Sequence, residues 1–156
     1  MREITLDDSE IIEALRDVER SIDPLMVEAA SMGADMIAAR ARNEHDYNDQ
    51  SGALTNSIQR GAVGGSFLDG TLEAEAAAGQ PYGFYLEHGT DDHKVVPRHR
   101  QALRWPVEGG FAFSRGHVVS GIEAREFLAK ALENEGDAIE EIFLDGVELA
   151  FTRAGL

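Results

Sequence analysis

The fold of this chain is decided by the stretch Pro81–Thr90, which reads Pro-Tyr-Gly-Phe-Tyr-Leu-Glu-His-Gly-Thr. Pro81 suits the first turn of a helix, where its missing N–H is not needed, and Gly89 suits the end of one. Tyr82 and Tyr85, followed by a leucine, have the i, i+3, i+4 spacing that gives a short helix one apolar face. Because a helix this short is not stable alone, we expect its rings to be buried between a sheet and longer helices.

Helical periodicity is found on both sides of this stretch. Apolar residues recur at helical spacing over residues 9–46. Within them, Asp23 suits an N-cap and Pro24 a first helical position, which predicts that one helix ends and a second begins there. Residues 121–153 have the same periodicity, with Gly136 as a point where this segment could divide into two helices.

The middle of the chain, residues 51–120, predicts strands and loops around the short helix near 81–88. Alternating apolar and polar residues indicate strands, and Asp69-Gly70 is typical of a hairpin turn. Pro106 favours an edge position for its strand, because proline cannot donate a ladder hydrogen bond. The predicted strands are 57–63, 71–78, 103–107 and 111–113.

These elements predict one α+β domain over residues 1–156. We expect a small, mostly antiparallel sheet flanked by N-terminal helices and a long C-terminal helical segment. Residues 1–8 are interpreted as a short arm or an edge strand. The absence of cysteine excludes a disulfide scaffold and thiol catalysis. No apolar run approaches the roughly 18–20 residues of a membrane span, so no membrane is expected as a partner.

The charge balance is strongly acidic, with 29 acidic and 14 basic residues and a formal net charge of −15. Such a chain is repelled by phosphate, which argues against sequence-independent DNA binding. Two compatible explanations remain open: a halophilic host, or an acidic lumen through which DNA slides without sticking. We favour the first, because lysine is scarce along the whole chain and occurs only at Lys94 and Lys130.

One basic patch interrupts this acidity. It consists of Arg98, His99, Arg100 and Arg104. These side chains could form ion pairs with the chain's own acidic surface, or they could make a docking contact with an acidic partner.

A cluster of imidazoles and carboxylates follows the short helix and raises the alternative of a metal-dependent hydrolase. Such groups can hold a divalent metal that activates water. The spacing fits no established zinc pattern, and in a chain this acidic carboxylates fall beside histidines by chance. The residues of this hypothesis are Glu87, His88, Asp91, Asp92 and His93.

Three segments together resemble a family of small tailed-phage proteins of the head–tail neck, the putative tail-component or tail-completion proteins. Residues 81–90 are similar to the family's Tyr-Ala-x-Tyr-hydrophobic-Glu-x-Gly-Thr. Residues 51–58, Ser-Gly-Ala-Leu-Thr-Asn-Ser-Ile, are similar to Thr-Gly-x-Leu-x-x-Ser-Ile. Residues 124–132, Ala-Arg-Glu-Phe-Leu-Ala-Lys-Ala-Leu, resemble Ala-Arg-Pro-Phe-Leu-x-x-Ala-Leu, with Glu126 in place of proline.

The resemblance implies a virion structural protein at the neck or tail-completion position of a tailed double-stranded DNA virus. It implies a homo-oligomeric ring, six-fold by analogy with tails, that joins the head-completion connector to the tail tube or terminator protein. DNA would pass through as cargo, and the chain would be in the host cytoplasm before it joins the head–tail junction of the virion. No enzyme activity, cofactor or metal is implied. A tail terminator, also a small α+β ring former, stays open as an alternative.

The residues expected to make interactions come from the three segments and from one strand. We expect Arg125 in the first turn of the C-terminal helix, where a positive charge opposes the helix macrodipole and needs an acidic partner. We hypothesise that Glu87 is that partner, so that reversing both charges would rescue either single reversal. The predicted interaction residues are Tyr82, Tyr85, Glu87, Trp105, Arg125 and Phe127.

Overall fold

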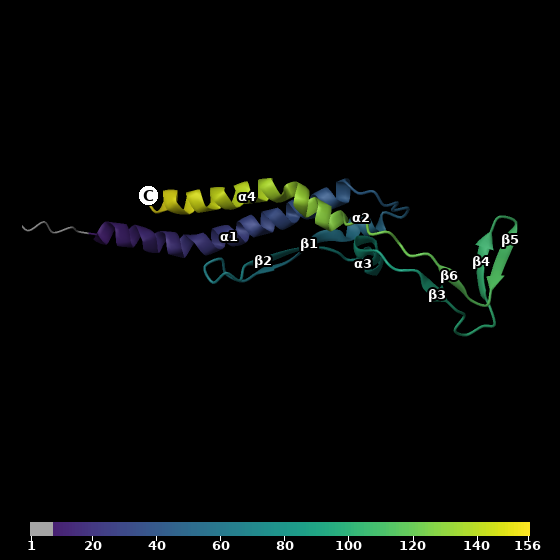
Figure 1. The fold of residues 1–156 in the computed structure, drawn as a ribbon. Coiled ribbons are helices and arrows are strands. Elements are labelled where there is room, and N and C mark those ends of the chain that lie inside the picture. Colours follow the sequence, from purple (N-terminus) through teal and green to yellow (C-terminus); the bar gives the residue numbers. More distant parts are fainter. Residues whose placement is uncertain (1–7) are drawn as a thin grey trace, which may run out of the picture.

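Two long helices form the frame of the molecule in a computed structural model that describes residues 8–156. Helix α1 spans Ser9–Asn43 and helix α4 spans Phe127–Arg153. They lie side by side and antiparallel, so the start of α1 and the end of α4 are at the same end of the molecule (Figure 1). The interpretation of residues 1–8 as an arm or edge strand lies outside the described residues, apart from Asp8.

Small residues allow the two long helices to approach closely. A Cβ atom on Gly33 of α1 would lie 3.2 Å from Ile139 Cγ2, and one on Gly146 of α4 would lie 2.6 Å from Met26 Cε. The half-buried ion pair between Arg40 and Glu135 adds a polar link between the two helices. One buried cluster between the two helices consists of Val18, Ile22, Leu25, Met26 and Ala150.

The prediction that a second helix begins at Asp23-Pro24 is wrong, because α1 continues through Pro24 without a break. An internal proline costs a helix roughly 3 kcal/mol. The apolar residues before and after it nevertheless stay on one buried stripe against α4, and this burial offsets the cost. Asp23 therefore caps no helix. Its carboxylate accepts hydrogen bonds from Ser66 Oγ at 2.7 Å and from the Leu68 N–H at 3.0 Å.

A β-hairpin packs on α1, and Figure 1 shows it on the side away from α4. It consists of β1, Ile58–Gly64, and β2, Glu73–Ala78, paired antiparallel as the alternation predicted. The short helix α2, Ala53–Ser57, precedes it and places Leu54 and Ile58 in the core. The helical body of the molecule therefore has three layers: α4, α1 and the hairpin.

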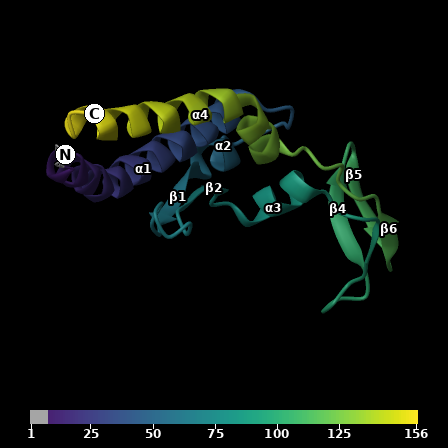
Figure 2. The same ribbon diagram turned by 60° about the vertical axis from the view of Figure 1, so that its left-hand side comes forward.

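The remaining strands form an arm that leaves this body at the end opposite to the C-terminus (Figures 1 and 2). Strand β3, His93–Val95, pairs with β6, His117–Val119, and β4, Leu103–Val107, pairs with β5, Gly110–Ser114. Residues 93–119 are called the β arm below. Helix α3, Pro81–His88, forms where the sequence predicted a short helix, and it lies at the root of the arm.

The α+β class is confirmed, but the strands are distributed over separate sheets. The described residues form three two-stranded antiparallel sheets, since the arm stands apart from the β1–β2 hairpin. Every strand is therefore an edge strand, including the one that holds Pro106.

The C-terminal helix differs from the prediction in the residue at which it begins and in being unbroken at Gly136. It begins at Phe127 and not near residue 121, because residues 121–126 pair with the chain that enters the β arm. Gly136 lies inside an unbroken helix. Packing against α1 over the length of α4 outweighs the weak helix propensity of a single glycine.

Asp23 gives a testable prediction for the loop between β1 and β2. Its hydrogen bonds from Ser66 and Leu68 lower its pKa below the ordinary value for an aspartate. A carboxyl group with a lowered folded-state pKa stabilises the fold above its unfolded pKa of about 3.9, and this contribution is lost as the pH falls through the lowered value. We expect Asp23→Ala to speed hydrogen exchange of the Leu68 amide at pH 7 severalfold. Exchange at wild-type rates would contradict the assigned role of Asp23, and Asp35→Ala serves as the control.

Candidate interaction site at the β arm and its root

Glu87 holds the root of the β arm to the start of α4. Its side chain is buried, and its two carboxylate oxygens accept hydrogen bonds from the backbone N–H groups of Leu128 and Ala129, each at 3.0 Å. These two N–H groups belong to the first turn of α4 and have no partner within the helix. A carboxylate at a helix N-terminus is also favoured by the macrodipole. Glu87 thus caps α4 from a distance of about forty residues in sequence.

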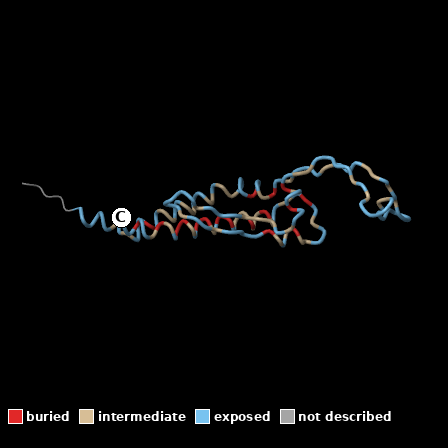
Figure 3. The backbone as a smooth tube through the Cα atoms, turned by 90° about the horizontal axis from the view of Figure 1, so that it is seen from below, coloured by how far each residue is buried: buried red, intermediate tan, exposed pale blue. Residues whose placement is uncertain are grey.

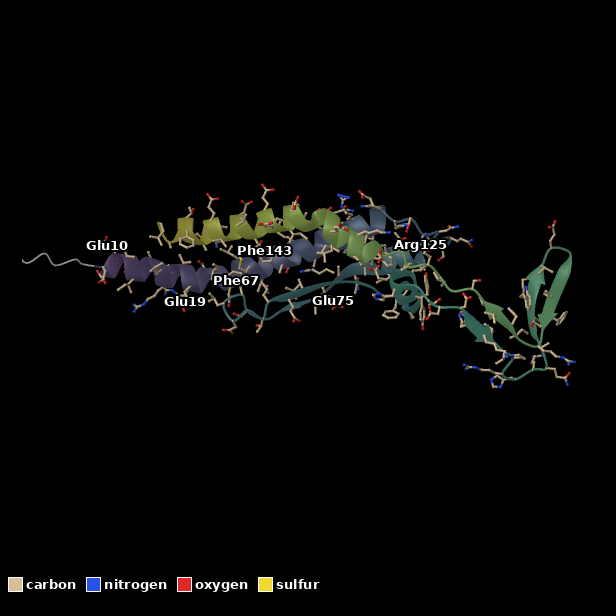
Figure 4. The ribbon with its side chains drawn as sticks, in the orientation of Figure 1. Glu10, Glu19, Phe67, Glu75, Arg125 and Phe143 are labelled. Atoms are coloured by element: carbon tan, nitrogen blue, oxygen red, sulfur yellow. The ribbon has the colours of Figure 1, made fainter. Side chains whose placement is uncertain are left out.

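The hypothesis that Glu87 pairs with Arg125 is wrong. The Arg125 guanidinium lies 3.6 Å from Asp46 and 3.9 Å from Glu123. Arg125 precedes α4 and is not in its first turn, where the sequence predicted it. Its backbone N–H donates to Leu86 O at 2.7 Å, which joins α3 to the chain leaving the arm. Figure 4 shows Arg125 at the end of the body from which the arm extends.

Two chain segments run alongside each other between α3 and the arm. The Thr90 N–H donates to Ile122 O at 2.8 Å, and the Ile122 N–H donates to Thr90 Oγ1 at 3.0 Å. Gly89 has a φ of +73°, and a Cβ there would lie 2.8 Å from Ile122 O. A Cβ on Gly121 would lie 1.8 Å from Thr90 O. The Gly-Thr pair that ends the central stretch is therefore required by backbone approach at the root.

The aromatic residues of α3 are not the buried plug that the sequence predicted. Tyr82, Phe84 and Tyr85 are all exposed, Phe84 to 64%. Helix α3 instead buries Gly83 and Glu87. A Cβ on Gly83 would lie 2.9 Å from Leu54 Cδ1, so α3 packs on the core through the side of the helix that carries this glycine. Tyr82 and Tyr85 are thus available for contact with another molecule.

The β arm has no core of its own. No residue from 88 to 126 is buried, and Figure 3 shows burial confined to the helical body. Trp105 is exposed to 38% and lies 5.2 Å from the His117 ring, centroid to centroid, where the two small sheets meet. Arg104 lies over the Phe111 ring at 3.6 Å. The large exposed apolar residues of the arm are Val96, Trp105, Val107, Phe111, Phe113, Val118 and Val119.

The exposed strand residues on the arm were missed by sequence reasoning, which interpreted only Trp105 as an interaction residue. Phe111 and Phe113 are two residues apart on the short strand β5, and the sequence pattern predicts them only as sheet residues. The signal that could have found them is the length of the arm segment. It contains four short strands and no helix that could cover their exposed side chains.

Phe127 is a core residue and not a surface contact. Its side chain is 2% exposed and meets the Tyr47 ring edge-on, with centroids 5.1 Å apart. Tyr47 in turn stacks on His45, and burial raises the pKa of the Tyr47 hydroxyl. The buried members of this cluster are Ala38, Ala41, Tyr47, Leu54, Ile58, Phe127 and Ala131. Phe127 was therefore wrongly assigned to an interaction surface.

The imidazole and carboxylate cluster does not converge. Glu87 is occupied by the N–H groups of α4, the His88 ring packs at 4.5 Å from Phe84, and Asp92 accepts a hydrogen bond from Gly121. In the part of the chain that the structure describes, no three His, Cys, Asp or Glu side chains are close enough to hold a metal ion. The hydrolase hypothesis thus gains no geometric support.

Comparison with known proteins identifies no relative. No family model, no curated protein and no solved structure matches the chain. Among residues 8–156, no helix is both long and apolar enough to cross a membrane.

The cap made by Glu87 is testable by substitution. We expect Glu87→Ala to lower the free energy of unfolding by about 2 kcal/mol, because two partly buried N–H groups lose a charged acceptor. Urea unfolding followed by circular dichroism measures the change. Glu123→Ala is the matched control and should change stability by less than about 0.5 kcal/mol, since Glu123 is exposed to solvent. Combining Glu87→Arg with Arg125→Glu should not restore stability. If the double variant recovered wild-type stability, a direct ion pair between Glu87 and Arg125 would have to be accepted after all.

Proposed function

We propose that this chain is a structural protein of a tailed double-stranded DNA virus. Its place is the neck or tail-completion position, where copies form a ring around the DNA channel and join the head connector to the tail. The observation that carries the proposal is the β arm. An arm of two-stranded sheets with exposed aromatic rings and no buried residue is marginally stable alone and gains its stability from a neighbouring molecule.

The arrangement of the three family-like segments supports the resemblance. Leu54 and Ile58 come from the first segment, and Phe127 and Ala131 from the third, and all four share one buried cluster. Leu86 of the second segment packs against that cluster. Segments that match a family pattern in sequence order and also build one packed unit are better explained by a common fold than by chance.

The acidic body fits a role beside DNA without binding it. Glu73 and Glu75 on β2 are exposed, on the side of the body away from α4 (Figure 1). Carboxylates repel the phosphate backbone, so a channel lined with them lets DNA pass without sticking. The ring would be a purely structural part, and its assembly would require no catalysis.

The location of the protein tests the proposal directly. An antibody raised against the recombinant chain, applied with gold label to particles from the source lysate, should mark the junction of head and tail. Antibody preabsorbed with the protein is the control. Particles without label, with the protein free in the lysate, would contradict the proposal.

Deletion of the coding sequence separates a neck protein from a tail terminator. A protein that joins two finished parts leaves both complete when it is missing, so we expect DNA-filled heads and full-length tails that remain separate. A terminator ends tail growth, so its loss would give tails without a fixed length. Electron microscopy of the lysate distinguishes the two results.

A further inference from the structure

The basic and acidic residues are divided between two parts of the molecule, the β arm and the rest of the chain. The β arm, residues 93–119, carries five of the fourteen basic residues and one of the twenty-nine acidic residues. The rest of the chain carries nine basic and twenty-eight acidic residues. One chain therefore presents a basic arm and a strongly acidic body. The basic residues of the arm are Lys94, Arg98, Arg100, Arg104 and Arg115.

The basic side chains of the arm are unpaired within the chain. All five are exposed, and among residues 8–156 none of them forms an ion pair with a carboxylate. The arm extends away from the body, so the acidic helices lie out of its reach in the same molecule (Figures 1 and 2). The alternative that the basic patch is neutralised by the chain's own acidic surface is therefore wrong.

A complementary surface lies along the outer side of α4. Six exposed residues recur there at i, i+4 and i+7 spacing, which places them on one face of the helix. Five are acidic and the sixth, Leu144, is apolar and exposed to 61%. Figure 4 shows carboxylate oxygens along the side of α4 that faces away from α1. We call this the outer α4 face: Glu133, Asp137, Glu140, Glu141, Leu144 and Glu148.

The outer α4 face is also unpaired within the described residues. The carboxylate of α4 that does form an ion pair, Glu135, faces Arg40 of α1 and lies outside this set. The face thus offers a row of carboxylates with an apolar residue among them. The arm offers guanidinium groups with exposed aromatic rings between them. The two surfaces are therefore opposite in charge, and Leu144 gives the rings an apolar contact on α4.

We propose that the β arm of one copy docks on the outer α4 face of a second copy. The two surfaces are different parts of the same chain, so the contact is head-to-tail. Each copy then uses its arm on one neighbour and its α4 on the other. Such a contact repeats from copy to copy, and it closes into a ring when the rotation between neighbours divides a full turn. The inference deepens the proposed function and rests on it only for the closure and location of the ring.

Charge reversal tests this pairing on the purified full-length protein. One variant carries Arg98→Glu, Arg100→Glu and Arg104→Glu, and a second carries Asp137→Lys, Glu141→Lys and Glu148→Lys. Analytical ultracentrifugation and native mass spectrometry measure the mass in dilute salt. We expect the wild-type chain to self-associate and each variant alone to associate at least tenfold more weakly. An equimolar mixture of the two variants should recover the wild-type mass, because each arm then meets an opposite charge.

A third variant controls for the change in total charge. Glu10→Lys, Glu13→Lys and Glu19→Lys alter the net charge as much as the α4 variant, but on exposed positions of α1. This variant should associate as the wild type does. Circular dichroism shows whether each variant is folded, and recovery in the mixture excludes misfolding as the cause.

Three results would overturn the inference. They are a wild-type chain that stays monomeric at all concentrations, a mixture that does not recover association, and an α4 variant that associates normally when the arm variant does not. The last would place the arm on another surface or partner. These results do not depend on the gold labelling of particles. If the arm and α4 pair but no label is found at the neck, the proposed function is wrong and this inference stands. If label is found at the neck but the arm and α4 do not pair, this inference is wrong and the proposed function stands.

Discussion

The structure depends on the carboxylate of Glu87, which accepts the N–H groups of Leu128 and Ala129. This contact joins the end of α3 to the start of α4, and so fixes where the chain leaves the helical body and where it returns. The backbone bonds from Arg125 to Leu86 and from Thr90 to Ile122 depend on the same alignment. The two segments are thus held together at their base, and the residues between them extend outward as an arm (Figure 1).

That constraint explains why the surface of the molecule is unusual. A single chain of this size normally covers its aromatic residues, yet here the rings of α3 and of the arm remain exposed. The arm extends away from the body, so its apolar residues and its basic side chains are presented together, far from the acidic helices (Figure 2). Exposure of this kind is costly in a monomer and useful in an assembly. This exposure supports the proposal that the chain is a component of an assembly.

Sequence reasoning succeeded where the signal was local. Pro81 and Gly89 predicted α3, and Asp69-Gly70 predicted the turn between β1 and β2. It failed where tertiary contacts decide, since the burial of apolar residues against α4 overrides the break at Pro24. Of the interaction residues, Tyr82, Tyr85 and Trp105 are exposed, whereas Phe127 is core and Glu87 is a cap. No spacing rule could reveal that Glu87 meets the backbone of a helix forty residues away.

The central claim is that the β arm is completed by a neighbouring molecule, and amide hydrogen exchange at two protein concentrations tests it most directly. Mass spectrometry of the intact chain would compare the exchange of β4 and β5 with that of α1 and α4. The account predicts that the strands of the arm are protected in concentrated protein and exchange rapidly on dilution, while the helices are unchanged. Equal protection of β4 and β5 at both concentrations would show that the arm is stable alone and would contradict the account.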